Sequence, residues 1–158
     1  MIESILVPKD RVNVIKDHVT RERVEKDACV KLSFDENTVI IDGDGLNLLT
    51  AMNIVKAISR GFAPDKAYRL LDEEELLEII DIDYSPKKAK MIKARLIGTG
   101  GKTRRMIEEF SGSSMSVYGK TVSIIGKYEQ NAIAKEAIQM LLDGSSHAHV
   151  YKFLFDAR

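Results

Sequence analysis

The segment LIGTGGKTRRMIEE, residues 96–109, gathers residue types that can hold phosphate groups. Three glycines stand next to a Lys-Thr pair and two arginines in this short stretch. Backbone N–H groups of a glycine-rich turn ahead of a helix bind phosphate, either of a nucleotide such as ATP or of a nucleic acid strand. The segment therefore raises two alternatives, a small-nucleotide site and a nucleic-acid interface.

The spacing of the glycines argues against a nucleotide site. The phosphate-binding loop of ATPases has a glycine five positions before the glycine of its Gly-Lys-Ser/Thr triplet. Leu96 and Ser114 occupy that position ahead of the two Gly-Lys-Thr triplets of this chain. The dinucleotide-binding fingerprint fails as well, because Thr103 stands where its last glycine or alanine belongs.

A turn between two helices is the better setting for these glycines. Gly98, Thr99, Gly100 and Gly101 form a G-x-x-G sequence between two apolar-periodic segments. Their side chains are absent or small, so a phosphodiester backbone can approach the turn closely. The first amides of the following helix would face that backbone with a partial positive charge. We therefore expect a nucleic-acid interface at this turn.

Opposite charges are sorted into neighbouring parts of the chain, although the formal net charge is zero. Residues 72–84 contain seven acids and no base, whereas residues 85–105 contain eight bases and no acid. Binding depends on the local field rather than on the sum of charges. Four lysines crowd the first half of the expected helix, where each opposes the helix dipole by about 0.3–1 kcal/mol. An anionic strand beside the helix explains them better than the alternative, a solvated helix face.

Other kinds of chemistry find little support in the sequence. The single cysteine, Cys29, excludes an internal disulfide framework and fits a reducing compartment. His147 and His149 have no further metal ligand at suitable spacing, so we expect no metal site. We find no acid–base pair or nucleophile arrangement, and we predict neither catalysis nor a cofactor. No apolar run approaches the roughly 20 residues that span a bilayer, and the start does not resemble a signal peptide, so the expected location is the cytoplasm.

A shift of 83 positions superimposes two halves of the chain. VIIDG at residues 39–43 falls on VSIIG at residues 122–126, and YRLL at residues 68–71 falls on YKFL at residues 151–154. Gly61 falls on Gly144, and each glycine ends a helical pattern. Together these matches predict a duplicated module of about 70–80 residues.

The second copy has readable boundaries. We expect a strand at residues 75–82, helices at residues 86–97 and 102–110, strands around residues 113–117 and 121–126, and a helix at residues 127–142. Ser85 and Pro86 are a typical helix start, and Gly98 and Gly112 are typical stops. The order is strand, helix, helix, strand, strand, helix.

The first copy predicts the same order, which gives an α+β fold of two modules packed as one compact unit. We place the first module at residues 1–61, a helical and acidic linker at 62–75, the second module at 76–144 and a helical tail at 145–158. No glycine precedes Gly43, and the positions matching the turn are Ile15, Lys16, Asp17 and His18. The first copy therefore keeps the fold and lacks the glycine turn. Rigid packing or protein binding are its expected roles.

The segment IGTGGKTRRMI resembles the KH signature I-G-x-x-G-x-x-I-x-x-I, and the order of elements is similar to that of a type I KH domain. Arg104 departs from the signature, which has isoleucine at that position. The combination of GGKTRRMIEE, VYGKTVSIIG and the terminal VYKFL is similar to archaeal relatives of the Partner of Nob One family. These are tandem-KH factors of small-subunit ribosome assembly, and the resemblance covers nearly the whole chain.

The resemblance implies a single-stranded RNA-binding protein that grips about four nucleotides through the second module. The RNA would be small-subunit ribosomal RNA near its 3′ end. The endonuclease that matures that end and the alpha subunit of archaeal initiation factor two are the implied partners. The rival hypothesis is a protein-interaction scaffold in which RNA binding is incidental.

The predicted RNA-binding residues form three groups. The turn and its cations contribute Gly98, Thr99, Gly100, Gly101, Lys102, Arg104 and Arg105. The preceding helix contributes Lys87, Lys88, Lys90 and Lys93. Ile97, Ile107, Met115 and Val117 would line the floor of a groove, although core residues would have the same pattern. Arg104 and Arg105 have a structural alternative as well, since Glu108 and Glu109 lie four residues further on and can pair with them.

Overall fold

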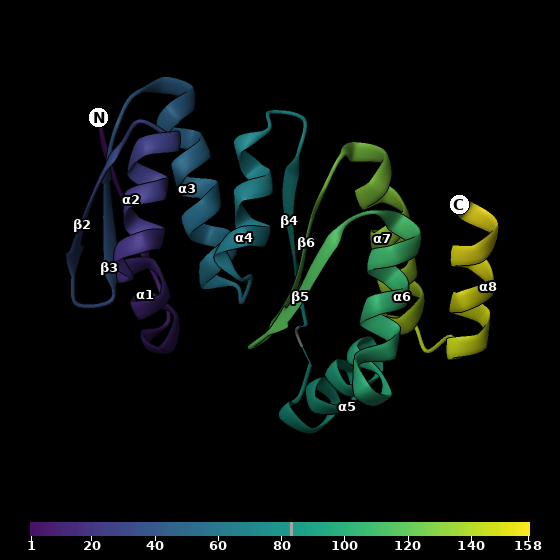
Figure 1. The fold of residues 1–158 in the computed structure, drawn as a ribbon. Helices are drawn as coiled ribbons and strands as arrows, with labels where there is room; N and C mark the ends of the chain where they lie inside the picture. The colour runs from purple at the N-terminus through teal and green to yellow at the C-terminus, as the bar shows by residue number, and fades with distance from the viewer. Residues whose placement is uncertain (83) are drawn as a thin grey trace. The chain divides into compact units, whose positions relative to one another are not determined.

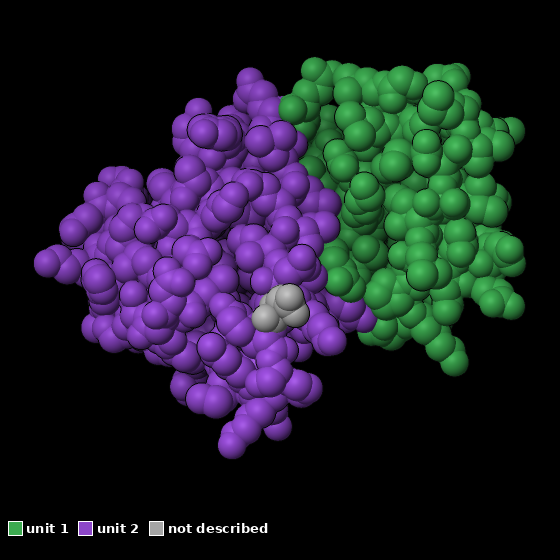
Figure 2. All heavy atoms as spheres, turned by 180° about the vertical axis from the view of Figure 1, so that it is seen from behind, with its two compact units in different colours: residues 1–73 green, residues 74–158 purple. Residues whose placement is uncertain are grey.

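The structure is a computed structural model that describes residues 1–82 and 84–158. Residue 83, which belongs to the acid-rich stretch noted above, lies outside the described residues. The chain divides into two compact units, Met1–Glu73 and Glu74–Arg158 (Figure 2). Each unit contains a three-stranded antiparallel sheet with helices on one face (Figure 1).

The first unit follows the predicted order of elements. Its elements are β1 (Ile2–Leu6), α1 (Lys9–Lys16), α2 (His18–Asp27), β2 (Lys31–Asp35), β3 (Thr38–Asp42) and α3 (Gly45–Ser59). The short helix α4 (Pro64–Ala67) and the 3-10 helix η1 (Tyr68–Leu71) follow them. The sheet order is β1-β3-β2, and the predicted hairpin turns at Glu36 with a φ of 54°.

The second unit repeats this order and ends in one longer helix where the first unit has α4 and η1. Its elements are β4 (Leu76–Asp81), α5 (Pro86–Ile97), the 3-10 turn η2 (Thr99–Gly101), α6 (Lys102–Ser111), β5 (Ser114–Tyr118), β6 (Thr121–Gly126), α7 (Tyr128–Leu142) and α8 (His147–Ala157). The sheet order is β4-β6-β5, so the last strand of the module is central in both units. Ser85 caps α5 as predicted, with its Oγ accepting a hydrogen bond from the Lys88 amide at 3.4 Å.

The secondary structure confirms the duplication. A shift of 83 residues maps β2 onto β5 and α3 onto α7 without a gap. The first helices differ, since α1 has 8 residues and α5 has 12. This shortening explains why the sequence match is lost towards the N-terminus.

Alternating apolar residues build the core of the second unit, and a large set of them is fully buried. The fully buried large side chains include Ile82, Leu96, Ile107, Ile124, Ile138, Leu141 and Leu154. At about 25 cal/mol per Å² of apolar area removed from water, such a cluster is the main source of the unit's stability. On α6, Ile107 is buried, whereas Met106 and Phe110 are partly buried against the core.

The described helices include none that is both long and apolar enough to cross a membrane. The contacts of the chain group α4 and η1 with the first unit and α8 with the second. The finer boundaries at residues 61 and 144, between module and appended helices, stay predictions.

Candidate nucleic-acid interface

The glycine turn between α5 and α6 has a backbone that other residues rarely adopt. Gly98 ends α5 with φ 75° and ψ 172°, and Gly100 has φ 61° and ψ 20°. The first of these conformations is essentially restricted to glycine, and the second is left-handed. The amide of Gly98 still donates to the Ala94 carbonyl at 2.8 Å, and that of Gly101 donates to the Gly98 carbonyl at 3.1 Å. The turn is therefore hydrogen-bonded as well as sharp.

The two sides of the turn differ in how much room they leave. A Cβ atom built on Gly98 would overlap the Thr103 side chain and lie 2.8 Å from the Thr103 amide nitrogen. A Cβ atom built on Gly100 would meet nothing within 4 Å, and Thr99 and Gly100 are exposed. The turn thus packs against α6 on one side and presents bare backbone to solvent on the other.

The cations around the turn fall into two classes. Lys102 and Arg105 are exposed, and Arg105 donates from Nη1 to the Gly100 carbonyl at 2.6 Å. Arg104 is half-buried, and its Nη1 lies 2.9 Å from Glu108 Oε1. The predicted alternative of pairing four residues on therefore holds for Arg104, whereas Arg105 bends back to the turn. Arg105 adds a full positive charge beside the open backbone.

The lysines of α5 lie along the helix that leads into the turn. Lys87, Lys88 and Lys90 are exposed, and Lys93 is half-buried. Lys88 Nζ lies 4.6 Å from the centre of the Tyr84 ring. The two helices that flank the turn, α5 and α6, therefore both carry exposed positive charges.

The predicted groove residues separate by burial. Ile107 has 0% of its surface exposed and Met115 has 3%, and both belong to the core cluster. Ile97 and Val117 are half-buried. The core alternative therefore applies to Ile107 and Met115, which have almost no surface to offer a base. Ile97 and Val117 keep the exposure that a groove floor requires.

A hydrogen-bonded carboxylate links α6 to the edge strand β5. Glu108 Oε2 accepts a hydrogen bond from the Met115 amide at 3.0 Å, while Oε1 of the same group pairs with Arg104. Because β5 lies at the edge of the sheet, its outward-facing amides lack a neighbouring strand. Glu108 thus satisfies one such amide and at the same time pairs with Arg104.

Three residues that sequence reasoning did not select surround the turn from behind. Tyr151 on α8 has its hydroxyl 2.8 Å from Thr103 Oγ1, and His147 Nε2 lies 3.0 Å from the Arg95 carbonyl oxygen. Arg95 donates to the carbonyls of Leu141, at 3.0 Å, and of Ser145. The match of YRLL with YKFL was the available signal, but it gave no indication of which residues Tyr151 contacts.

The corresponding junction in the first unit has a different construction. A single residue, Asp17 with φ −51° and ψ 132°, joins α1 to α2, and Ile15 before it is fully buried. The two helices therefore meet without a glycine turn, as the sequence predicted.

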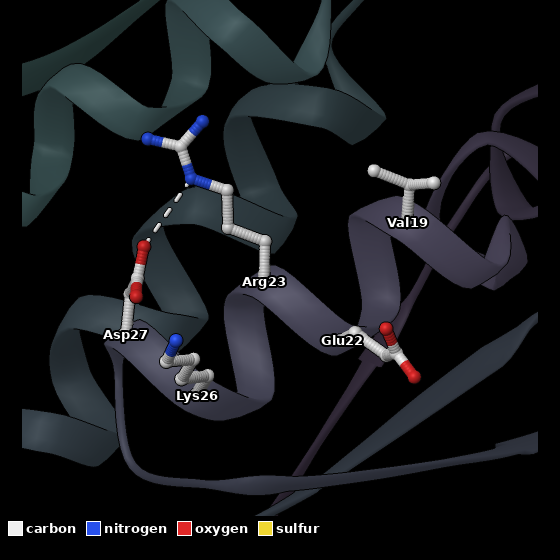
Figure 3. A pocket seen from close by; sticks show the side chains of 5 residues that line it. All are labelled: Val19, Glu22, Arg23, Lys26 and Asp27. Atoms are coloured by element: carbon white, nitrogen blue, oxygen red, sulfur yellow. Dashed lines mark hydrogen bonds and ion pairs between the residues drawn. The ribbon is translucent and has the colours of Figure 1, made fainter.

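A hollow of about 380 Å³ opens beside α2, lined by Val19, Glu22, Arg23, Lys26 and Asp27 (Figure 3). Arg23 pairs with Asp27 at 3.2 Å, and its guanidinium stacks 3.9 Å above the Tyr68 ring. The lining carries both signs of charge, so this hollow does not select for an anionic strand. The described residues contain no group of His, Cys, Asp and Glu that could hold a metal ion.

Comparison with known proteins shows which family this chain is similar to. The family described as Eukaryotic type KH-domain (KH-domain type I) matches residues 74–158. A KH domain-containing protein of Methanocaldococcus jannaschii is 47% identical over 97% of this chain and 72% of its own length. The pre-rRNA-processing protein pno1 of Aspergillus fumigatus is 35% identical over 63% of this chain, which spans only 42% of that protein.

Solved structures agree over nearly the full length of the chain. The crystal structure of Dim2p from Pyrococcus horikoshii has a TM-score of 0.90, 42% identity and 99% coverage of both chains. The same TM-score and identity are found for a chain in the a/eIF2alpha-aDim2p-rRNA complex of that organism, at 99% and 93% coverage. The fold and the sequence agree with those of proteins named pno1 and Dim2p. The chain therefore belongs to the Partner of Nob One family, as an archaeal-type member with two tandem type I KH modules.

Proposed function

We propose that this protein binds single-stranded RNA during assembly of the small ribosomal subunit, and that the second unit grips the strand. The observation that carries the proposal is the open turn at Gly98–Gly101. Its outer side is bare backbone, and two exposed cations, Lys102 and Arg105, stand at its end. A strand of phosphates is the ligand that this combination fits.

Each part of the interface would contribute a different interaction. The amides that open α6 carry the positive end of the helix dipole, and phosphate oxygens would accept hydrogen bonds from them. The lysines of α5 would neutralise the phosphates that follow. Ile97 and Val117 would offer apolar surface to the bases. The few aromatic residues of the chain favour hydrogen bonding and apolar contact over stacking.

The family supports the identity of the RNA. Relatives carry the names pre-rRNA-processing protein and RNA-binding protein, and the Pyrococcus complex contains ribosomal RNA. We propose small-subunit ribosomal RNA near its 3′ end as the target of this chain. The alpha subunit of the initiation factor, present in the same complex, and the endonuclease that matures the RNA are the proposed protein partners.

A protein-interaction scaffold is the second candidate, and one observation favours it. The first unit has the fold without the turn, and an acid, Asp17, stands at the junction of its helices. A module built this way would repel phosphate and would leave its surface for protein contacts. The two candidates differ in what the glycine turn does.

Fluorescence anisotropy with a labelled single strand carrying a small-subunit rRNA 3′ end separates the two. The variant is Thr99→Asp/Gly100→Asp, which adds two carboxylates on the exposed side of the turn. The matched control is Gly45→Asp/Asn47→Asp in the first unit, because Gly45 also has a positive φ, of 55°, and open space around it. Circular dichroism would check that both proteins fold.

We expect the turn variant to bind RNA about tenfold more weakly or worse, and the control to bind as the native protein does. The native affinity should also fall with salt, by about 0.7 power of salt for each phosphate neutralised, and the turn variant should have a smaller slope. If the native protein and the folded turn variant bound RNA with equal affinity, the turn would serve only to connect the two helices. The scaffold hypothesis would then be favoured.

A further inference from the structure

Helix α8 follows the last helix of the second module, in the place that α4 and η1 take in the first unit, and it contacts residues on both sides of the glycine turn. Before the turn, the Arg95 carbonyl oxygen lies 3.0 Å from His147 Nε2. After the turn, Thr103 Oγ1 lies 2.8 Å from the Tyr151 hydroxyl, and Lys102 Nζ lies 5.6 Å from the centre of the Tyr151 ring. Figure 1 shows α8 beside α6 and α7, away from the sheet. One helix is thus joined to the end of α5 and to the start of α6.

Helix α8 is itself firmly fixed. Val150 and Leu154 are completely buried in the core of the second unit. Ser146 caps the helix, with its Oγ accepting from the His149 amide at 3.2 Å. The Arg95 guanidinium donates to the carbonyl of Leu141 at the end of α7 and to that of Ser145 in the loop before α8. A helix anchored in this way can transmit rigidity to whatever it touches.

The glycine turn needs such support because it has almost no side chains of its own. Glycine has more backbone freedom than any other residue, so its conformation is set by what surrounds it. The surface that closes the turn from behind is Thr103, against which Gly98 packs. Thr103 is 1% exposed, and its hydroxyl is hydrogen-bonded to Tyr151. The orientation of the Thr103 side chain, and with it the wall behind Gly98, therefore depends on α8.

We propose that Tyr151 is a positioning residue for the RNA-binding turn, and that α8 is the brace through which it acts. The effect on RNA rests on the proposed function of the turn, whereas the effect on the turn itself does not. Tyr151 lies behind the turn and would not touch RNA. It would hold the backbone of residues 98–102 in the conformation that lets a strand of phosphates approach the turn.

A purely structural role for Tyr151 makes a different prediction. A side chain that only stabilises the unit would affect all its amides alike when it is altered. A positioning residue would affect the turn first. Hydrogen exchange of individual amides distinguishes the two roles, because local and global openings are resolved separately.

The test uses the full chain with Tyr151→Phe, which removes the hydroxyl and keeps the ring. The matched control is Tyr128→Phe, the same change on a side chain that is 74% exposed on α7. Thr103→Val removes the other hydroxyl of the pair, and the double variant completes the cycle. The reporter amides in the free protein are those of Gly98, Gly101 and Lys102, which donate to the carbonyls of Ala94, Gly98 and Thr99.

We expect the reporter amides to exchange about two- to tenfold faster in Tyr151→Phe, the range for loss of one hydrogen bond. Amides in the middle of α7 should stay unchanged, and the control should match the native protein. RNA affinity, measured by anisotropy as above, should fall by a similar factor with a shallower salt dependence. The double variant should add little to the larger single effect, because both changes remove the same bond.

Unchanged exchange at the turn would overturn the proposal, and so would an equal rise in all amides of the unit. It would also fail if exchange rose at the turn while Tyr151→Phe bound RNA as tightly as the native protein. Faster exchange at the turn together with no RNA binding by the native protein would have a separate meaning. The brace would then stand, and the proposed function of the turn would be the part that fails.

Discussion

Replacing Gly98 by alanine places a methyl group where the second unit has no room for one. The new Cβ atom would overlap the Thr103 side chain and lie 2.8 Å from the Thr103 amide nitrogen. Separations below 3.0 Å essentially do not occur for real Cβ atoms, and backbone cannot move aside as a flexible side chain can. Gly100 is the matched position two residues further on, since it also has a positive φ but has open space around it.

The size of the effect follows from these two environments. Backbone strain at the φ and ψ of Gly98 costs an alanine about 1–3 kcal/mol. The overlap with α6 adds about 1–3 kcal/mol, typical of an extra methyl group in a packed site. We therefore expect Gly98→Ala to lower the free energy of unfolding by about 2–6 kcal/mol. Gly100→Ala pays the left-handed strain alone, about 1–2 kcal/mol.

Urea unfolding followed by far-ultraviolet circular dichroism measures both values, fitted with one or two transitions as the two units require. The slope against urea should be the same for both variants, so that midpoints can be compared. The reasoning would be refuted if Gly98→Ala were no more destabilising than Gly100→Ala. That result would mean that α6 can move away from the turn, and that Thr103 can shift to make room for the added methyl group.

Two further substitutions test the core beneath the interface, each by the same urea titration. Ile107→Ala should lower the free energy of unfolding by about 2–5 kcal/mol because the side chain is completely buried. The control, Ile79→Ala on β4, should cost clearly less, because Ile79 is 43% exposed. Equal losses would contradict the assignment of Ile107 to the core. Asn131→Ala should cost about 2–4 kcal/mol, since it removes a completely buried side chain and leaves its two partners without their hydrogen bonds. These partners are the Leu76 carbonyl at 3.0 Å and the Ser113 hydroxyl at 2.8 Å. A loss within about 0.5 kcal/mol, as at ordinary surface positions, would show that the network around Asn131 is not needed.

Much of the fold was accessible from the sequence because its signals are local. Proline and serine at the start of α5, and glycine after α5 and α6, mark the helix ends whatever lies around them. The repeat at a shift of 83 residues then predicted that the first copy has the same order of helices and strands as the second. The periodicity of α6 predicts burial of Met106, Ile107 and Phe110, and only Ile107 is completely buried. Met106 and Phe110 lie at the edges of the apolar face, where exposure depends on which neighbour covers them.

In the candidate site, too, the sequence predicted some features, whereas others depend on the tertiary structure. The spacing predicted that Arg104 and Arg105 could each pair with a glutamate four residues further on, and only Arg104 does so. Arg105 bends to the Gly100 carbonyl instead, because the turn brings that oxygen within 2.6 Å. The sequence pattern of Ile107 and Met115 fits a groove floor as well as a core, and in the structure both are buried in the core cluster. No periodicity can distinguish an apolar residue that faces a groove from one that faces the core.

The sequence by itself determined the glycine turn, the cations next to it, the absence of that turn from the first copy, and the order of elements. Each depends on residue type and on neighbours within a few positions, where backbone preference and hydrogen-bonding capacity are already decided. Only the tertiary structure decided which cations stay beside the turn and what lies behind it. Thr103 and Tyr151 are 48 residues apart and meet because α8 packs against α6. Contacts of that kind arise from the packing of a whole core, and a local pattern carries no record of them.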